Sequence, residues 1–314
     1  MTTHGNESKS FIRGVNLGGA FVFERYITPY FFALTTCDLK GDFRFYPDQV
    51  DAPPTTSPIY KHMDTDECKP VLPYPVDEWT LTDAFDDKEI AKRYLEIHYD
   101  NFITRKDIKF LKQNGVSHVR VPLGHWITGN IAEDEPFVDG AWPYFKRLVG
   151  WCREEGIQIW PDIHTAPGSQ NGFDNSGHLL SVGPTCHGWD MDDMHAPEYN
   201  ATVLAAKMGQ AQNKTGEVVL SKNVLRTLDI VNEITLAVAR DNMTDVVTGF
   251  GILNEPFANC DMNVIRKFDD IALGIVRKNM GENASVYIGD VFNSSSFNDG
   301  WWIEPKYKGT YLDR

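Results

Sequence analysis

The strongest constraint on the fold is the alternation of short apolar runs with helix-like segments along the chain. Each run has the apolar character of a buried strand, and most end in polar residues. The predicted strands lie at 11–17, 116–123, 157–164, 247–255 and 286–292. Strands and helices in alternation favour parallel strands joined by right-handed crossovers. The sequence therefore predicts an α/β fold built on a parallel sheet.

The segments between these strands carry helix signals. Thr104, followed three residues later by Asp107, gives a capping-box pattern, and Gly115 ends the helix that this pattern begins. Residues 144–156 also end at a glycine, and residues 221–240 have the period of an amphipathic helix.

Two α/β architectures compete for such a chain. A doubly wound nucleotide-binding fold needs a glycine-rich turn that enters a helix, and GVNLGG at 14–19 lacks the required G-x-G-x-x-G spacing. Polar residues collect instead at the carboxyl ends of several strands, where (β/α)8 barrels keep their active sites. We therefore predict a TIM barrel that forms one domain over 11–314, after a polar tail at 1–10. Residues 38–80 and roughly 177–220 are expected to be irregular excursions from it.

Composition removes several classes of function. The net charge is -14, and no basic run is present, so we expect no nucleic-acid partner. No apolar run reaches the ~20 residues of a membrane span, and the polar start lacks a signal-peptide core. An acidic surface suits a neutral substrate such as a sugar. No cofactor or protein partner is indicated, and the complete protein is expected to be a monomer.

Sequons and cysteines bear on the compartment and on metals. Six N-x-S/T sequons favour a chain that enters the secretory pathway; they lie at Asn6, Asn200, Asn213, Asn242, Asn283 and Asn293. The five cysteines have no zinc-site spacing, and their odd number leaves one thiol free and room for one or two disulfides. His164 lacks a close second ligand, so we expect no metal there.

The candidate site residues stand at strand ends, at Asn16, Arg120, Asp162, His164, Asn254 and Glu255. A carboxyl group at the rim of an apolar strand suits a general acid, although Glu255 would also be explained as a helix cap or as a partner of Arg120. An arginine inside an apolar strand needs a carboxylate partner, in a structural ion pair or beside a catalytic carboxylate. Four tryptophans are candidate stacking platforms for sugar rings or simply core residues: Trp126, Trp189, Trp301 and Trp302.

Long motifs resemble those of the exo-β-1,3-glucanases of glycoside hydrolase family five, which are secreted or cell-surface enzymes. FIRGVNLGGAFVFERYITP at 11–29 is similar to the opening strand of that family. HYDNFITRKDIKFLKQNGVSHVRVPLGHW at 98–126 is similar to its second strand with the preceding helix. DIHTAPGSQNGFDNSG at 162–177 and GFGILNEP at 249–256 match its signature loop and its NEP motif.

The resemblance implies a retaining glycosidase on a (β/α)8 barrel that removes glucose from the non-reducing end of β-1,3-glucan. It assigns Glu255 as the acid/base and Asn254 as the residue that holds the sugar 2-hydroxyl. It also implies substrate-binding roles for Glu24, Arg120, His164 and Asn171. No cofactor or metal belongs to this mechanism.

The chain departs from the family pattern after Glu255. A retaining glycosidase needs a second carboxylate, the nucleophile, about 5–5.5 Å from the first. In the family it ends the seventh strand, which should lie at least ~90 residues after Glu255 at ~30 residues per βα unit. Only 59 residues follow Glu255. We therefore expect GTYLDR at 309–314 to be the sixth strand, the nucleophile to be absent from this chain, and the barrel to be truncated and incomplete.

Other glutamates were weighed for the nucleophile. By this reading Glu282 and Glu304 fall between the fifth and sixth strands, and Glu233 lies within a helix, so none of them replaces it. Two other functions remain open. One is a family-five enzyme that cuts β-1,4- or β-1,6-linkages, and the other is a catalytically dead, glucan-binding fragment.

Overall fold

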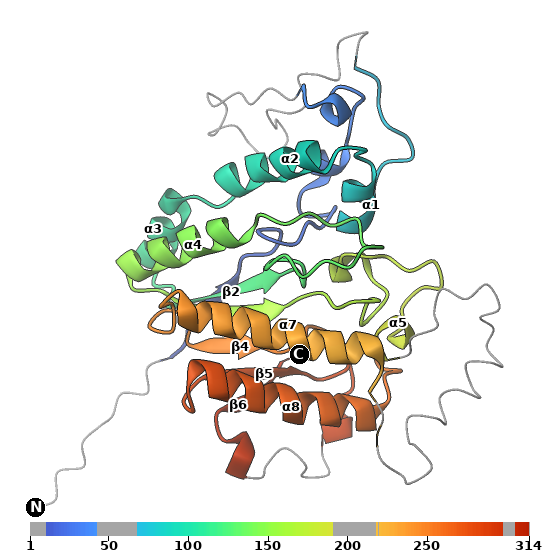
Figure 1. Ribbon diagram of the computed structural model, residues 1–314. Helices are drawn as coiled ribbons and strands as arrows, with labels where there is room; N and C mark the ends of the chain where they lie inside the picture. Colours follow the sequence, from blue (N-terminus) through green and yellow to red (C-terminus); the bar gives the residue numbers. More distant parts are fainter. Residues whose placement is uncertain (1–10, 43–67, 191–217, 219, 298–304, 314) are drawn as a thin grey trace, which may run out of the picture.

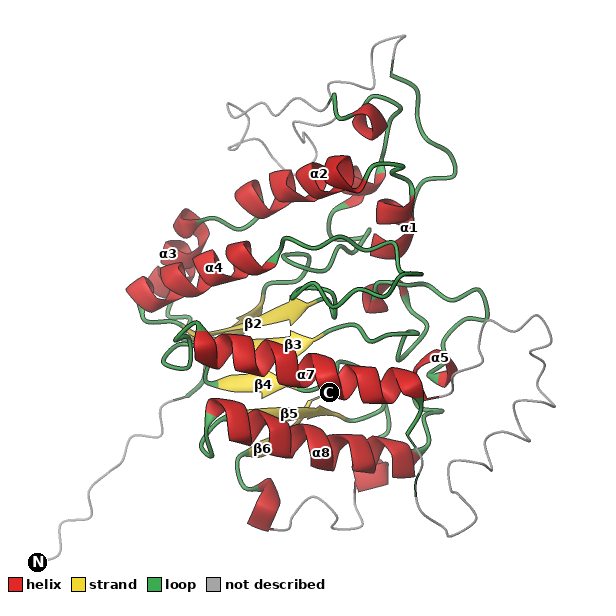
Figure 2. Cartoon of the chain, viewed as in Figure 1, coloured by secondary structure: helices red, strands yellow, loops and turns green. Residues whose placement is uncertain are grey.

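The computed structural model describes residues 11–42, 68–190, 218, 220–297 and 305–313 (Figure 1). Six strands form one sheet, in which each strand pairs in parallel with the next along the chain. Figure 2 shows them side by side behind a layer of helices. Their bounds are β1 (Gly14–Asn16), β2 (His118–Leu123), β3 (Gln158–Ile163), β4 (Gly249–Gly251), β5 (Ser285–Gly289) and β6 (Thr310–Asp313).

Helices follow the strands and cover one face of the curled sheet (Figure 1). They are α1 (Glu78–Asp83), α2 (Lys88–Asn101), α3 (Arg105–Gln113), α4 (Trp142–Glu155), α5 (His187–Asp190), α7 (Lys222–Arg240) and α8 (Met262–Met280). In β2, Val119 and Val121 are fully buried while Arg120 between them is not, which is the alternation expected of a strand covered on one face. The six described strands are parallel and follow the chain order, with α-helices after β1, β2, β3 and β4, and this arrangement confirms the predicted fold class, an incomplete (β/α)8 barrel.

The predicted helix signals are found in the structure. Thr104 and Asp107 form the capping box of α3, and the amphipathic segment predicted at 221–240 is helix α7. The structure adds that the side chain of Ser221 accepts a hydrogen bond from the N–H of Val224 at the start of α7. Helix α4 begins at Trp142, two residues before the predicted start, because Pro143 is accommodated in the first turn of a helix. None of the described helices is long and apolar enough to cross a membrane.

Strand β4 is shorter than the predicted run 247–255. The ladder ends at Gly251, although the N–H of Asn254 still donates to the carbonyl of Ile163 at 2.8 Å. Glu255 then has φ 46°, in the left-handed region, so the extended backbone stops there. The sequence correctly placed the end of the run but overestimated its regular part.

The structure decides the open alternative for two tryptophans and corrects the predicted position of one glutamate. Trp126 and Trp189 are 1% and 0% exposed, so both are core residues and offer no stacking surface to a sugar. Trp301 and Trp302 lie outside the described residues. Glu282 lies in the turn before β5, not between β5 and β6 as predicted, and therefore at the opposite edge of the sheet from the end of β4.

Two disulfides answer the question that the cysteine count left open. Cys37, next to the start of the predicted excursion at 38–80, pairs with Cys68 inside it, and Cys186 pairs with Cys260. Cys152 is free and buried.

Helix α1 brings a buried carboxyl group against the segment that follows β1. One oxygen of Glu78 accepts the N–H of Phe23 at 2.8 Å, next to Glu24 in the chain, and the Glu78 side chain is 0% exposed. Burial raises the pKa of Glu78 to about 8, with a further upward contribution from Asp77, against the hydrogen bond from the N–H of Phe23. Glu78 is therefore a proton-binding group that supports the loop carrying Glu24.

We expect the free energy of unfolding to fall as the pH rises toward 8. Because the folded-state pKa of Glu78 lies above its unfolded value, the stabilisation is complete below that unfolded value and is lost as the pH rises through about 8. At about 1.36 kcal/mol per pH unit, the loss from pH 6 to pH 8 is about 2 kcal/mol. Urea unfolding at the two pH values measures it. Glu78→Gln removes the titrating group, so an equally steep decline in that variant would contradict the assignment.

Candidate active site

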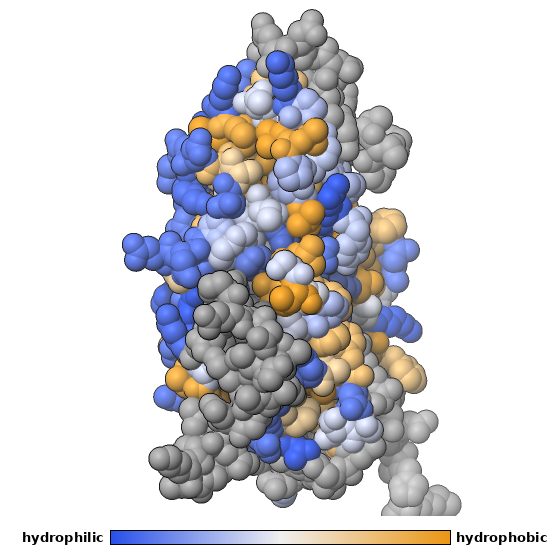
Figure 3. Space-filling model, turned by 90° about the vertical axis from the view of Figure 1, so that its right-hand side faces the viewer, coloured by the Kyte–Doolittle hydropathy of each residue, from blue (hydrophilic) through white to orange (hydrophobic). Residues whose placement is uncertain are grey.

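Five of the six residues to which the family resemblance gives a role line a single pocket of about 310 Å³: Glu24, Arg120, His164, Asn254 and Glu255. Asn16, a further strand-end candidate, lines it too. Arg120 lies within β2, His164 follows β3, and Asn254 and Glu255 follow β4. Glu24 lies in the segment after β1. All these strands point toward the same edge of the sheet, so residues far apart in sequence meet there. Figure 3 shows the molecule from that side, where apolar and polar residues are intermixed in the part not covered by grey atoms.

Glu255 is held at the end of β4 by contacts on two sides. Its Oε2 accepts a hydrogen bond from the Asn175 amide at 2.9 Å, and its side chain is partly exposed to the pocket. Gly289 at the end of β5 lies against the same segment, because a Cβ there would come within 2.8 Å of the Pro256 Cδ. A side chain at Gly289 would therefore displace the backbone that carries Glu255.

Arg120 is the centre of the polar network beneath Glu255. Its guanidinium donates to Asn254 Oδ1 at 2.7 Å and lies 3.2 Å from Asp162 Oδ2. Burial by itself would raise the pKa of Asp162, but Arg120 and His164 together hold that pKa below its ordinary value. The arginine thus pairs with Asp162, not with Glu255 as the alternative reading proposed.

His164 is oriented by the same carboxylate. Its Nδ1 lies 2.9 Å from Asp162 Oδ2, and the ring is buried while it lines the pocket. The contact between Nδ1 and Asp162 Oδ2 fixes the orientation of the ring. Asp162 therefore sets the direction of both Arg120 and His164.

Glu24 has a different environment from Glu255. The hydroxyl of Tyr26 donates to Glu24 Oε2 at 2.7 Å, and the carboxyl group is 3% exposed. Burial raises the pKa of Glu24; the Tyr26 bond and nearby His164 oppose this shift, and the Glu255 carboxylate adds to it. A carboxyl group with a raised pKa that is bound by a hydroxyl is suited to hydrogen bonding with a ligand more than to nucleophilic attack.

Gln170 joins the two strand ends that carry the site. Its amide nitrogen donates to the carbonyls of His164 and Asn254, at 2.8 and 2.9 Å, and its Oε1 accepts the N–H of Ala166. The side chain is fully buried. The loop after β3 and the end of β4 are consequently fixed to each other by one amide.

Asn171, the sixth predicted residue, does not line the pocket. It is 0% exposed and lies behind Asn175, to whose Oδ1 its amide donates at 3.3 Å. Asn175 in turn binds Glu255, so the structure places Asn171 one residue away from the pocket. The structure therefore does not place Asn171 in direct contact with a substrate in the pocket.

Sequence reasoning did not single out several lining residues, namely Tyr26, Asn175, Gly289, Asp290, Phe292 and Asp313. Tyr26 and Asn175 stand inside motifs that were recognised, two residues from Glu24 and within NGFDNSG. Of the last four, Gly289 ends β5, Asp290 and Phe292 follow it, and Asp313 ends β6. The rule that polar residues gather at strand ends would have found both aspartates. Phe292 has no such signal.

Phe292 forms one side of the pocket mouth. It is 52% exposed and packs edge to face against Phe257 and Phe173, with ring centroids 5.8 and 6.4 Å away. Phe257 and Phe173 also contact each other in the same geometry. An exposed aromatic face supported by two other rings is a surface on which a sugar ring can stack.

The described residues contain one group with metal-ligand character, Cys186, Asp190 and Cys260. The two cysteines are joined in a disulfide, which leaves a single carboxylate as a ligand. The pocket around Glu255 offers no cluster of this kind within the described part of the chain.

The chain is similar in sequence to several fungal proteins named glucan 1,3-beta-glucosidase. The chain is 30% identical over 282 residues, 90% of its length, to a protein of Pichia angusta named glucan 1,3-beta-glucosidase, of which it covers 48%. It is also 30% identical over 93% of its length to the Candida oleophila protein of the same name, of which it covers 53%. The similarity inferred from the motifs is confirmed, and the chain spans about half the length of the curated relatives it matches.

The fold comparison agrees with the sheet order. The crystal structure of a rutinosidase from Aspergillus niger superposes with a TM-score of 0.61 over 96% of this chain and 68% of that one, at 17% identity. At that identity the match concerns the fold alone. No protein-family model matches the chain.

Proposed function

We propose that the pocket at the strand ends belongs to a retaining glycoside hydrolase that releases glucose from β-1,3-glucan. The observation that carries the proposal is the meeting of Glu24, Arg120, His164, Asn254 and Glu255 in one pocket. Similarity to proteins named glucan 1,3-beta-glucosidase supports the substrate class. The aromatic mouth around Phe292 supports a sugar ligand.

Glu255 is proposed as the acid/base. It donates a proton to the glycosidic oxygen as the bond to glucose breaks, and then takes a proton from the water that completes hydrolysis. Asn254 supplies the grip on the 2-hydroxyl: its Oδ1 is taken by Arg120, and its buried Nδ2 has no hydrogen-bond partner within the described part of the chain. A buried amide without a partner is costly, and a substrate hydroxyl would satisfy it.

The nucleophile, which is the second carboxylate of a retaining glycosidase, is proposed to be none of the other acidic side chains described in the pocket. Three such side chains accompany Glu255: Glu24, Asp290 and Asp313. Glu24 is bound by Tyr26 and has a raised pKa, and Asp313 lies 3.5 Å from the Arg120 guanidinium. Asp290 Oδ1 accepts the N–H of Phe292. These bonds fit structural and substrate-binding roles.

Because none of the described acidic side chains in the pocket fits the role of nucleophile, a second candidate function is a glucan-binding chain that does not hydrolyse its ligand. Binding would use the pocket and its aromatic mouth and would need no nucleophile. The place of action is proposed to be extracellular or at the cell surface, because the described sequon asparagines Asn242, Asn283 and Asn293 are all exposed and therefore open to glycosylation.

A substrate panel tests the proposal. Glucose release is measured from laminarin, cellulose and pustulan, which carry β-1,3-, β-1,4- and β-1,6-linkages, alongside binding of each by calorimetry. Hydrolysis of laminarin in preference to the other two supports the β-1,3-glucosidase. Preference for cellulose or pustulan replaces it with another linkage specificity. Binding of laminarin without glucose release establishes the non-hydrolytic function, and neither binding nor release of any glucan refutes both.

A further inference from the structure

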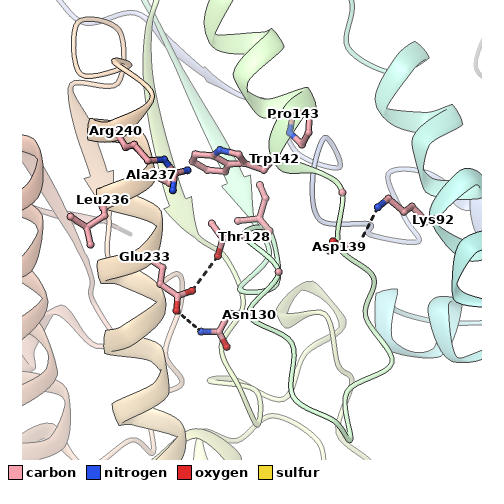
Figure 4. Close-up of a pocket in the computed structure, with 13 residues that line it drawn as sticks. Lys92, Thr128, Asn130, Asp139, Trp142, Pro143, Glu233, Leu236, Ala237 and Arg240 are labelled. Atoms are coloured by element: carbon pink, nitrogen blue, oxygen red, sulfur yellow. Dashed lines mark hydrogen bonds and ion pairs between the residues drawn. The ribbon is translucent and has the colours of Figure 1, made fainter.

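A second concave site lies between α4 and α7, on the helical side of the sheet (Figure 4). It has a volume of about 660 Å³ and shares no lining residue with the pocket around Glu255. Helix α7 packs along α8 but stands apart from α4, and the space between these two helices is the groove. The volume falls within the range of ligand-binding pockets, ~300–1,000 Å³. We call this feature the α4–α7 groove.

The groove is shaped by the loop between β2 and α4. Gly140 in that loop has φ 120°, and a Cβ there would come within 2.7 Å of the Lys92 side chain. Lys92 itself is paired with Asp139 at 3.2 Å, which fixes one rim (Figure 4). The rim is therefore a defined surface and not a gap between loosely placed loops.

An aromatic ring is fixed at the start of α4. Trp142 donates its indole N–H to Asp241 Oδ2 at 3.0 Å and packs against Phe145, with ring centroids 5.3 Å apart. Figure 4 shows the ring reaching from α4 toward Ala237 and Arg240 of α7. Leu236 of α7, which also lines the groove, is 47% exposed. Together they give the groove an apolar surface that stays in place without a ligand.

A planar carboxylate faces this apolar surface from α7. Glu233 is exposed, and its two oxygens accept hydrogen bonds from Asn130 at 3.0 Å and Thr128 at 3.4 Å (Figure 4). Each oxygen has a second lone pair that these bonds do not use. The carboxylate is thus held in one orientation with acceptor capacity to spare.

The charges of the groove are balanced. Lys92 and Arg240 contribute two positive charges, and Asp139 and Glu233 contribute two negative charges. A site of this balance has no preference for an anion or a cation, so it fits a neutral ligand. A fixed indole ring together with oriented carboxylate, amide and hydroxyl groups matches the apolar face and the hydroxyl edge of a sugar.

We propose that the α4–α7 groove binds a short neutral saccharide, a segment of a β-linked glucan chain, separately from the pocket around Glu255. The choice of a glucan rests on the proposed function, whereas the preference for a neutral saccharide rests on the groove itself. A second site of this kind would hold a polymeric substrate on the protein surface while a chain end occupies the pocket.

The test is calorimetric titration with laminaripentaose, carried out in a Glu255→Gln background so that the ligand stays intact. Two binding sites are expected. Glu233→Ala weakens binding at the groove about tenfold, the loss expected for a hydrogen bond to a charged group, and leaves the pocket site unchanged. Asn254→Ala weakens the pocket site and leaves the groove site. Glu233 is exposed, so its variant is expected to fold normally, as an unchanged thermal midpoint would show.

Asp229→Ala is the matched control, since Asp229 is exposed on the same helix one turn away and does not line the groove. Two sites with unchanged affinities are expected in that variant. The groove proposal is overturned if Glu233→Ala titrates like the unmodified background, or if Asp229→Ala loses as much affinity. If every variant that keeps Glu233 binds at the groove but none binds at the pocket, the proposed function of the pocket is refuted and the groove proposal stands.

Discussion

Replacing Arg120 with alanine is expected to lower the free energy of unfolding at pH 7 by about 3 kcal/mol, a value typical of breaking a buried ion pair by removing one partner. Asp162 would remain with a side chain that is 4% exposed and without its guanidinium. Its Oδ1 already has no hydrogen-bond partner within the described residues, so the protein has little to offer in compensation. Urea unfolding monitored by tryptophan fluorescence measures the change.

The same change has a predictable pH dependence. The pKa of Asp162 is lowered in the folded state, so its ion pair stabilises the protein above the ordinary aspartate pKa, and this stabilisation is lost as the pH falls through the lowered value. The stability difference between the original protein and Arg120→Ala should therefore be full at neutral pH and shrink in acid. Arg105→Ala is the control, because Arg105 forms an exposed pair with Glu154 at 2.7 Å that is worth under ~1 kcal/mol. Equal losses in the two variants would show that Arg120 has no special role.

The sequence predicted the fold well wherever the evidence was local. A capping box located α3, an amphipathic period located α7, and apolar runs located five strands to within a few residues, because each of these signals lies within one continuous segment of the chain. The end of β4 was less accurate, since the ladder depends on its neighbours and on the left-handed backbone of Glu255. Neither of these is visible in a single run of residues.

In the candidate site, too, the sequence predicted what local patterns determine and missed what depends on residues far apart in the chain. Residues at strand ends were brought together as predicted, because parallel strands direct their carboxyl ends to one edge. The partner of Arg120 was left open by the sequence, and the structure resolved it as Asp162, two residues before His164 on the neighbouring strand. Gln170 and Asn175 were missed as individual residues, although their loop was recognised. Their importance comes from hydrogen bonds to residues about 80 positions away, which no local pattern encodes.

The second large effect is expected at Glu255. Replacing it with glutamine keeps the shape of the side chain and an acceptor for Asn175, but removes the group that donates and accepts the proton. Glutamate acting in general acid–base catalysis contributes roughly 10²–10⁴-fold to the rate. If the protein hydrolyses laminarin, Glu255→Gln should lose glucose release by a factor in that range while its affinity for laminari-oligosaccharides changes little. Glu282→Gln, at the opposite edge of the sheet, is the control and should keep full activity.

The leaving group of the substrate separates an acid/base role from a merely structural one. In a protein that hydrolyses laminarin, the dinitrophenolate of a dinitrophenyl glucoside leaves as a stable anion that needs no proton, so the first step of hydrolysis should be nearly unaffected in Glu255→Gln. The second step still needs a base to activate water, and added azide can replace water there because it attacks the glycosyl–enzyme ester without losing a proton. Glucosyl azide of retained β-configuration is then expected, with release of the enzyme carboxylate. An equal loss on laminarin and on the dinitrophenyl glucoside, unrelieved by azide, would instead mean that Glu255 holds the pocket together and moves no proton.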